Sequence, residues 1–294
     1  MARIALIGPG AVGGSVAAWL AQDPAHEVTL CARSPLTRLV VDTPRGTISA
    51  APHIVTRVED AGVADWVLVA TKAYDCAGAC AWFETLLAPG TRIAILQNGI
   101  QHRARFAGLV EDTRLVPAIV DIPAERIAAG HIVQRRIGTI VVADDEAGRD
   151  FVALFAKTPI RVSATGDFAS VAWRKLALNC AGAVNALTLR PAGVADIDAV
   201  TQVMRGLVRE CVAVARAEGV ALPDALADEV VANGRAADPQ SLNSLLADRL
   251  AGRPLEADAR NGVIVRLGAR HGIATPLNGM AMALLSAASA APLP

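Results

Sequence analysis

The sequence lacks an excess of charge of either sign, and it is poor in aromatic residues. Lysine plus arginine equals aspartate plus glutamate, at 28 each, so no overall field would attract the chain to nucleic acid or to an anionic membrane. Aromatic residues make up only 3% of the chain, whereas hydrophobic residues make up 53%. This composition predicts a core of alanine, valine and leucine in closely packed helices and strands, and it argues against disorder.

Cysteine and histidine show no spacing typical of a metal site. The five cysteines are odd in number and form no CxxC pair. Because they lie among apolar residues, we expect free, buried thiols in a reducing compartment. The histidines are scattered, without HExxH or a similar spacing, so the sequence predicts no bound metal.

Uncharged segments that could cross a membrane are also missing. The uncharged run near the N-terminus, residues 4–21, contains Gly8-Pro9-Gly10 and Gly13-Gly14, which would break a signal or membrane-spanning helix. No later stretch is both long enough and free of charge. We therefore expect a cytoplasmic protein that binds neither membrane nor nucleic acid. With 294 residues and no internal repeat, the chain has room for two domains.

A glycine-rich turn stands at the start of the chain. An apolar strand, residues 4–7, is followed by Gly8-x-Gly10-x-x-Gly13 and then by an apolar helix, residues 16–20. Strand, turn and helix in this order are the fingerprint of dinucleotide binding. Gly8 would make the tight turn, Gly10 would leave room for a pyrophosphate, and Gly13 would let the helix pack closely on the strand. A turn that needs its glycines for packing alone is the alternative.

The helix start and the second strand predict which dinucleotide binds. Backbone N–H groups at the beginning of the helix, with Ala11 and Val12 among them, would face the phosphates. The second strand, residues 26–33, ends at Arg33 without a carboxylate. In NAD-preferring enzymes an acidic residue binds the ribose 2′-hydroxyl there, whereas arginine can pair with a 2′-phosphate. The sequence therefore favours NADP (NADPH). A solvated arginine with no ligand is the alternative.

Two further strand ends carry polar residues. Lys72 directly follows the strand expected at residues 65–71, and Asn98 follows the strand expected at residues 91–96. Because the carboxyl ends of strands border the ligand crevice of an open α/β sheet, we expect both side chains at the cofactor and substrate site. Either could also be an ordinary loop residue.

The chain changes character near residues 163–168. Before that point, further strands are expected at 115–120, 137–142 and 159–162, a helix at 151–156, and a hairpin or a loop over the site at 121–136. After it, apolar residues recur at helical spacing to the end. We therefore expect an α/β fold. A Rossmann-type doubly wound sheet would form an NADP-binding domain, residues 1–166, and an all-helical C-terminal domain, residues 167–294, would carry substrate binding and catalysis.

One helix of the second domain carries a lysine among apolar neighbours. Lys175 and Asn179 are four residues apart, so they share one helix face. A buried lysine gives up a proton more readily than an exposed one. Lys175 therefore suits the role of general acid for a carbonyl oxygen that becomes an alkoxide on hydride addition. A lysine that reaches from a core helix to the surface is the alternative.

A second group of polar residues lies nearer the C-terminus. Ser244 and Asp248 share the face of one expected helix, and Leu255 is expected to begin another. Glu256 would then lie in its first turn, where a carboxylate suits the helix dipole. Glu256 and Arg260 could equally form an exposed i,i+4 ion pair with no catalytic task.

With these motifs, the sequence resembles the ketopantoate reductase family (2-dehydropantoate 2-reductases) over its whole length. The resemblance implies NADPH-dependent reduction of 2-dehydropantoate to pantoate, a step of pantothenate biosynthesis. It is carried by the GPGAVGG turn, Arg33, Thr71-Lys72-Ala73, Leu96-Gln97-Asn98-Gly99, the stretch from Trp173 to Cys180, and the stretch from Ser244 to Gly262.

The resemblance also implies roles for individual residues. Lys175 would be the general acid, and Glu256 would bind the substrate hydroxyl or help to position Lys175. Asn98 and Asn179 would orient the substrate and the nicotinamide, and Ser244 would bind the substrate carboxylate. NADPH or the rim of the substrate would be bound by Lys72 and Arg33.

Two departures from the family pattern concern the substrate. Ala183 stands where the family has a further asparagine, and Asn185 could replace it only if Gly182 loosens the helix. The bulky, charged segment 119–126 replaces a stretch rich in glycine, threonine and alanine, which implies a remodelled pocket. We expect the reaction type to survive these changes better than the identity of the substrate.

Three readings therefore remain open. The first is the reduction of 2-dehydropantoate, and the second is the reduction of another 2-oxo acid or ketone by the same fold. The third is a sensor that binds NADP without catalysis, although such a protein would not need Lys175. The apolar C-terminal segment, residues 283–288, could lie in the core or at the surface of a homodimer, which we favour.

Overall fold

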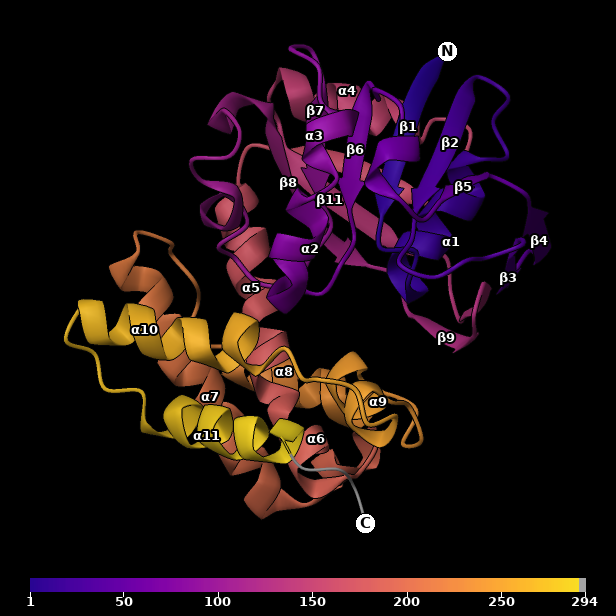
Figure 1. Ribbon diagram of the computed structural model, residues 1–294. Helices are drawn as coiled ribbons and strands as arrows, with labels where there is room; N and C mark the ends of the chain where they lie inside the picture. The colour runs from indigo at the N-terminus through magenta and orange to yellow at the C-terminus, as the bar shows by residue number, and fades with distance from the viewer. Residues whose placement is uncertain (291–294) are drawn as a thin grey trace. The chain divides into compact units, whose positions relative to one another are not determined.

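The structure is a computed structural model that describes residues 1–290. The chain divides into two compact units (Figure 1). The first is Met1–Phe168, and the second begins at Ala169. The boundary expected from the sequence, between residues 166 and 167, lies close to this division.

The first unit is built on an eight-stranded sheet. Six neighbouring strands run parallel and are followed by β11, which is antiparallel to β8, and by β12, which is parallel to β11. Apart from β3 and β4, which belong to another sheet, the parallel strands follow the Rossmann order 3-2-1-4-5-6. Across the sheet the strands are β5 (His53–Val55), β2 (His26–Cys31), β1 (Ala2–Ile7), β6 (Trp66–Val69), β7 (Arg92–Ile95), β8 (Leu115–Asp121), β11 (Thr139–Ala143) and β12 (Arg161–Thr165).

Both faces of this sheet are buried, because side chains alternate along each strand. Ile4 and Leu6 of β1 pack into one apolar cluster, and Ala5 and Ile7 pack into the other. The first cluster includes residues of α1 (Ala11–Leu20) and α4 (Glu146–Leu154), and the second includes residues of α2 (Cys76–Cys80) and α3 (Phe83–Leu86). The expected doubly wound sheet is confirmed.

A smaller four-stranded sheet lies against α1. Its order is β4 (Gly46–Ala50), β3 (Leu39–Thr43), β10 (His131–Gln134) and β9 (Ala124–Ala128). A Cβ on Gly14 of α1 would collide with Ile132 of β10, so this glycine is needed for packing. The segment 121–136 thus forms a hairpin, but in this separate sheet. Strands β3, β4 and β5 have no counterpart among the predicted elements.

The charged segment 119–126 joins the two sheets. It contains the end of β8 and the start of β9. Asp121 lies 2.6 Å from Arg136, and Glu125 lies 2.8 Å from Arg135. Both acidic side chains therefore pair with arginines that follow β10 in the same unit. The remodelled pocket expected from this segment stays a prediction.

The second unit contains helices joined by loops and no strand among its described residues, as the periodicity predicts. Most of its buried side chains are leucine, valine and alanine, which agrees with the low aromatic content. The helices are α5 (Phe168–Ala181), α6 (Ala183–Thr188), α7 (Asp198–Ala217), α8 (Leu226–Ala236), α9 (Ser244–Leu250), α10 (Val263–Arg270) and α11 (Pro276–Ala290), with a 3-10 turn at Ala192–Asp196 and a π-helical turn at Asp258–Gly262.

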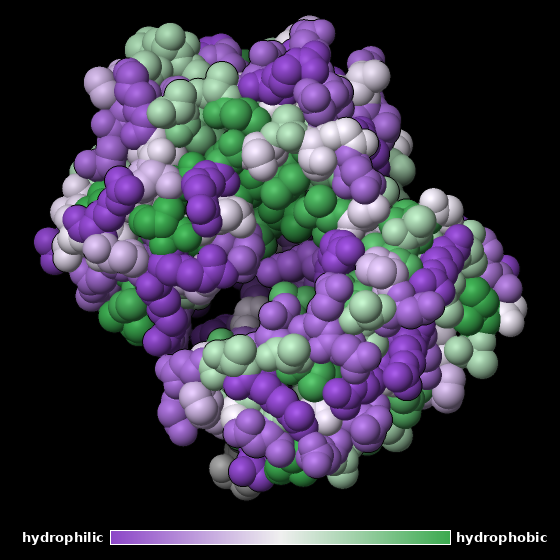
Figure 2. All heavy atoms as spheres, turned by 180° about the vertical axis from the view of Figure 1, so that it is seen from behind, coloured by the Kyte–Doolittle hydropathy of each residue, from purple (hydrophilic) through white to green (hydrophobic). Residues whose placement is uncertain are grey.

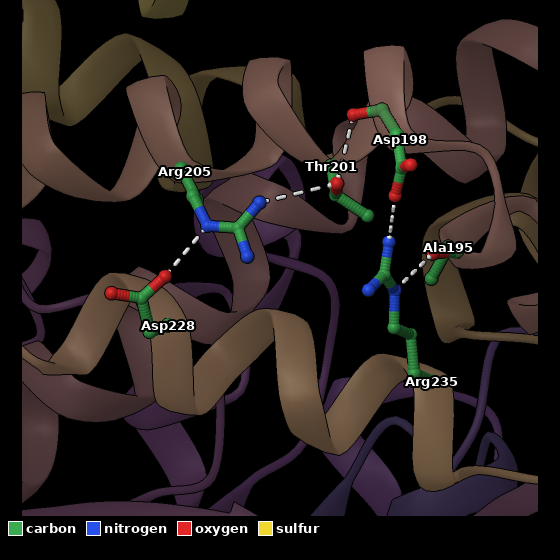
Figure 3. A network of polar contacts seen from close by, with 6 residues as sticks. All are labelled: Ala195, Asp198, Thr201, Arg205, Asp228 and Arg235. Carbon is green, nitrogen blue, oxygen red and sulfur yellow. Dashed lines mark hydrogen bonds and ion pairs between the residues drawn. The ribbon is translucent and has the colours of Figure 1, made fainter.

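Two arginines tie α7 to its neighbours (Figure 3). Arg205 donates to Asp228 of α8 at 2.6 Å and to Thr201 at 3.2 Å. Arg235 of α8 donates to the carbonyl of Ala195 at 2.9 Å and pairs with Asp198. Exposed ion pairs contribute little each, but this network fixes the 3-10 turn and α8 against α7.

The cysteines are all free, as expected, and three of them, Cys31, Cys180 and Cys211, are buried. Burial raises the pKa of the Cys31 thiol to about 12, so this thiol is unreactive at neutral pH. Cys76 and Cys80 are only half-buried, which corrects the expectation that every thiol is buried. Both lie on the short helix α2, next to a strand end of the site described below.

The surface of each unit is mixed in character. Figure 2 shows hydrophilic residues over much of the visible face of both units, with smaller groups of hydrophobic residues between them. Among the helices that the structure describes, none combines the length and the apolar character needed to span a bilayer.

Candidate active site

The three glycines of the N-terminal turn meet different surroundings. Gly8 has a φ of +87°, and a Cβ on it would lie 2.8 Å from the backbone nitrogen of Thr71. A Cβ on Gly13 would lie 2.8 Å from that of Ala70, and closer still to the carbonyl of Gly8. Around a Cβ on Gly10, no described atom lies within 4 Å. Packing therefore explains Gly8 and Gly13, whereas the open position at Gly10 fits the approach of a ligand.

The N-terminus of α1 is prepared for an anion. Gly10 is its N-cap residue, no described side chain caps it, and no acidic residue lies in its first turn. The N–H groups of Ala11, Val12 and Gly13 have no acceptor within the helix, because a helix leaves its first N–H groups unsatisfied. They point out of the helix end together with its partial positive charge, which is the usual arrangement for a phosphate.

Three predicted side chains follow the carboxyl ends of parallel strands on either side of β1. Arg33 follows β2, Lys72 follows β6, and Asn98 follows β7. The strand order reverses at β1, and ligands of such sheets bind at this reversal. The side chain of Arg33 is 85% exposed and lies 3.2 Å from the carboxylate of Asp75. Its guanidinium therefore pairs with Asp75 at the surface and remains open to an added anion on its exposed side.

The backbone around Asn98 is braced by Arg105 and His102, neither of which lies in a motif of the sequence. Arg105, in the 3-10 turn Arg103–Phe106, donates to the carbonyl of Asn98 at 2.7 Å and to Gln97 Oε1 at 3.2 Å. The amide of Gln97 donates to Thr71 Oγ1 at 3.0 Å, which links the ends of β6 and β7. Nε2 of buried His102 lies 2.8 Å from the carbonyl of Gln97.

His102 is held neutral by its surroundings. Burial, with a smaller effect from the positive charges of Arg105 and Arg103, lowers the pKa of His102 to about 4. The neutral ring must carry its proton on Nε2 in order to donate to the carbonyl of Gln97. No local motif predicts the role of His102, because its contact with the carbonyl of Gln97 depends on how the chain folds back after β7.

We expect this histidine to make the folded state acid-sensitive. The unfolded chain binds a proton on His102 near pH 6.5, whereas the folded chain binds it only near pH 4, so stability falls as the pH drops between these values. The expected loss is about 3 kcal/mol. Urea unfolding from pH 7 to pH 4 would measure it. In His102→Gln, which keeps a donor for the same carbonyl, the free energy of unfolding should fall by less over this range. An equal fall in both proteins would contradict the assignment.

In the second unit, the predicted lysine helix is interrupted just after the predicted asparagine. Lys175 and Asn179 are half-buried on α5, which ends at Ala181, and α6 begins after Gly182. Near this break, Asn261 Nδ2 donates to the carbonyl of Cys180 at 3.2 Å. The helix is thus interrupted at Gly182, which is the condition under which Asn185 could replace the missing asparagine.

Asn185 is buried in α6 and is engaged within the fold. Its amide donates to the carbonyls of Arg190 and Pro191, both at 3.1 Å, and its oxygen accepts from Asn243 at 3.1 Å. Asn243 also caps α9 through the N–H of Leu246. Substrate binding by Asn185 stays a prediction, and these contacts favour a structural role, since both of its N–H donors are used.

The C-terminal group of polar residues is not the exposed ion pair that was one reading of the sequence. Glu256 is 3% exposed and Arg260 is 2% exposed. Arg260 Nη2 donates to Ser244 Oγ at 2.8 Å. The helix begins after Glu256 instead of at Leu255, and Arg260 lies in the π-helical turn. Such turns widen a helix locally and are frequent at functional sites.

Two family models match most of the chain. The model described as Ketopantoate reductase PanE/ApbA matches residues 4–146. The model described as Ketopantoate reductase PanE/ApbA C terminal matches residues 167–289. The break between the two matches lies close to the division between the two compact units.

Individual proteins match over nearly the whole length. The chain is 60% identical over 289 residues to a 2-dehydropantoate 2-reductase of Caulobacter vibrioides, covering 98% of this chain and 100% of that protein. It is 38% identical to a 2-dehydropantoate 2-reductase of Mycobacterium tuberculosis, covering 98% of each. The crystal structure of a PanE/ApbA family ketopantoate reductase from Ralstonia eutropha JMP134 superposes with a TM-score of 0.90, at 31% identity and 98% coverage of both chains.

Proposed function

Since the chain belongs to the ketopantoate reductase PanE/ApbA family, we propose that it reduces 2-dehydropantoate to pantoate with NADPH. This activity makes it an NADP-dependent oxidoreductase of pantothenate biosynthesis. The proposal rests on one observation above all. A single chain combines an open Gly10 at an uncapped helix start with the Lys175–Asn179 pair on α5. A dinucleotide sensor would need the first feature and not the second.

NADPH fits the residues of the first unit. The N–H groups at the start of α1 would bind its pyrophosphate, and the open position at Gly10 leaves space for the approach. Arg33 would bind the 2′-phosphate, and Lys72 would bind the cofactor or the rim of the substrate. Asn98 would orient the nicotinamide and the substrate. When bound, NADPH supplies a hydride to the ketone carbon.

The second unit would supply the proton and hold the substrate. Lys175 would protonate the oxygen that becomes an alkoxide, because its ammonium both stabilises the developing negative charge and carries the proton. Asn179, one helical turn away, would orient the substrate. Ser244 would donate to the substrate carboxylate, and Glu256 would bind the substrate hydroxyl or position Lys175.

Turnover against a panel of 2-oxo acids tests the proposal directly. Oxidation of NADPH should be fast with 2-dehydropantoate and slow with acids that lack its hydroxyl group. Fast turnover of another acid alone would keep the mechanism and discard the substrate, and it would point to Ala183 and the segment 119–126. Tight binding of NADPH without turnover of any acid would favour the sensor. A homodimer and a cytoplasmic location stay predictions.

Arg33 should set the preference between the two nicotinamide cofactors. We expect Arg33→Ala to raise the KM for NADPH by about 30-fold, since a charge-assisted bond to a phosphate contributes about 2 kcal/mol. The KM for NADH, which has no 2′-phosphate, should change less than about threefold. Arg149→Ala is the matched control, because Arg149 is also an exposed arginine in an ion pair, with Asp144. Equal losses with both cofactors would refute the assignment to the 2′-phosphate.

A further inference from the structure

Arg260 is a buried cation in direct contact with the hydroxyl of an exposed serine. It is the largest fully buried side chain in the described part of the protein. Its Nη2 donates to Ser244 Oγ at 2.8 Å, and Ser244 itself is exposed at the first position of α9. The two residues come from different elements, the π-helical turn and α9. The hydroxyl of Ser244 therefore lies between a buried positive charge and the surface.

Stability does not explain why a guanidinium is buried here. Removing a guanidinium from water is costly, and buried ion pairs are often replaced by apolar residues without loss of stability. Burial lowers the pKa of Arg260, and the carboxylates of Glu256 and Asp248 oppose this effect. Nε of Arg260 has no hydrogen-bond partner among the described residues. An arginine that served the fold alone would be expected to satisfy this donor.

The contact with Arg260 leaves the hydroxyl of Ser244 to act as a hydrogen-bond donor toward any further partner. A serine hydroxyl has one proton to donate and lone pairs to accept, whereas a guanidinium can only donate. With Arg260 donating to its oxygen, Ser244 must direct its own proton elsewhere. The hydroxyl thus offers a donor, strengthened by the charge behind it, to an acceptor on its exposed side. A carboxylate fits this demand best, because it only accepts and is negatively charged.

The neighbouring charges explain why a cation is required. Asp248 pairs with Arg253 at 2.8 Å, and Glu256 is a second buried carboxylate close to Arg260. Without Arg260, the positive charge in contact with Ser244 Oγ would be lost, and a substrate carboxylate on Ser244 would meet more of the negative charge of Glu256 and Asp248. Burial makes the repulsion stronger than it would be in water.

We propose that Arg260 is a positioning residue that determines specificity: it holds Ser244 as a hydrogen-bond donor and offsets the charge of Glu256, so that the site binds the carboxylate of a 2-oxo acid. The inference rests on the proposed function, because it assigns a reason for the binding of that substrate class. It adds a residue that acts through Ser244 and not on the reacting atoms.

Steady-state kinetics of four variants with 2-dehydropantoate test this inference. Arg260→Met should raise KM by about 30-fold while kcat falls less than about threefold and the Kd for NADPH stays unchanged. Arg260→Lys, which keeps the charge but loses the fork, should recover part of the loss, with KM raised by about fivefold. Ser244→Ala should raise KM by about 30-fold. In the double variant, Arg260→Met with Ser244→Ala, KM should be within about threefold of the KM of the worse single variant, because both changes remove the same interaction.

Arg270→Met is the matched control. Arg270 is a guanidinium of the same helical segment, paired at the surface with Glu218, and it has no contact with Ser244 in the structure. Its KM should stay within twofold of the wild type. Thermal unfolding of every variant separates folding from binding. If Arg260→Met does not fold, the test uses the raised KM of Arg260→Lys and a further double variant, Arg260→Lys with Ser244→Ala, whose KM should be no higher than that of Ser244→Ala alone within about threefold.

The outcomes separate the two proposals. A wild-type protein that reduces no 2-oxo acid overturns the proposed function and this inference with it. A wild-type protein that reduces 2-dehydropantoate, with an unchanged KM in Arg260→Met, overturns the inference alone. A rise in KM accompanied by a fall in kcat and in NADPH affinity, with none of them restored in Arg260→Lys, would show a purely structural role and would also overturn the inference.

Discussion

Lys175→Ala should lower kcat by about 1,000-fold, while the Kd for NADPH changes less than twofold. General acid catalysis by a positioned side chain contributes about 100- to 10,000-fold, and the lysine also stabilises the developing alkoxide. The cofactor residues lie in the first unit, whereas Lys175 lies on α5, so cofactor binding should be preserved. Turnover of NADPH with saturating 2-dehydropantoate, and fluorescence titration of NADPH, measure the two quantities.

Arg174→Ala is the control for this variant. Arg174 is the preceding residue of the same helix, is exposed, and pairs with Glu229 of α8 at 3.3 Å. Its replacement removes a neighbouring positive charge without touching the face of Lys175, so kcat should stay within threefold of the wild type. Similar losses in both variants would mean that helix charge or stability limits the rate. An unchanged kcat in Lys175→Ala would remove this residue from the mechanism.

The second large effect is expected in the glycine turn, where two substitutions should fail for opposite reasons. Gly10→Val should keep the fold, since a Cβ there lies more than 4 Å from any described atom beyond the neighbouring backbone, but it should weaken NADPH binding by at least about 100-fold by filling the approach to the phosphates. Gly13→Val should lower the free energy of unfolding by more than about 3 kcal/mol, because its side chain would collide with Ala70 and the carbonyl of Gly8.

Isothermal titration with NADPH and urea unfolding distinguish these failures. Gly62→Val provides the control, since Gly62 also has open space around it and lies away from the helix start. It should change neither the Kd nor the stability by a measurable amount. Normal NADPH binding in Gly10→Val would support the alternative that the turn needs its glycines for packing only.

Much of the candidate site could be predicted because its signals are local. The turn from Gly8 to Gly13 joins a strand and a helix that follow each other directly, so three glycine positions predict strand, turn and helix together. Lys175 and Asn179 share a face through the period of a single helix. The ends of β2, β6 and β7 follow from short apolar runs, which place Arg33, Lys72 and Asn98 at one sheet edge. These residues are either close together in the sequence or follow parallel strands, whose carboxyl ends lie at the same edge of the sheet.

The tertiary structure decided what depends on contacts between distant segments. Strands β3 and β10 pair although about ninety residues separate them, and neither carries a pattern that names its partner. The burial of Arg260 is decided in the same way. On an isolated helix the spacing of Glu256 and Arg260 suits an exposed ion pair, and only the packing of α9 and its neighbours puts the guanidinium against Ser244. Local sequence therefore determined the cofactor turn and the lysine helix, while long-range packing decided which charges are withdrawn from water.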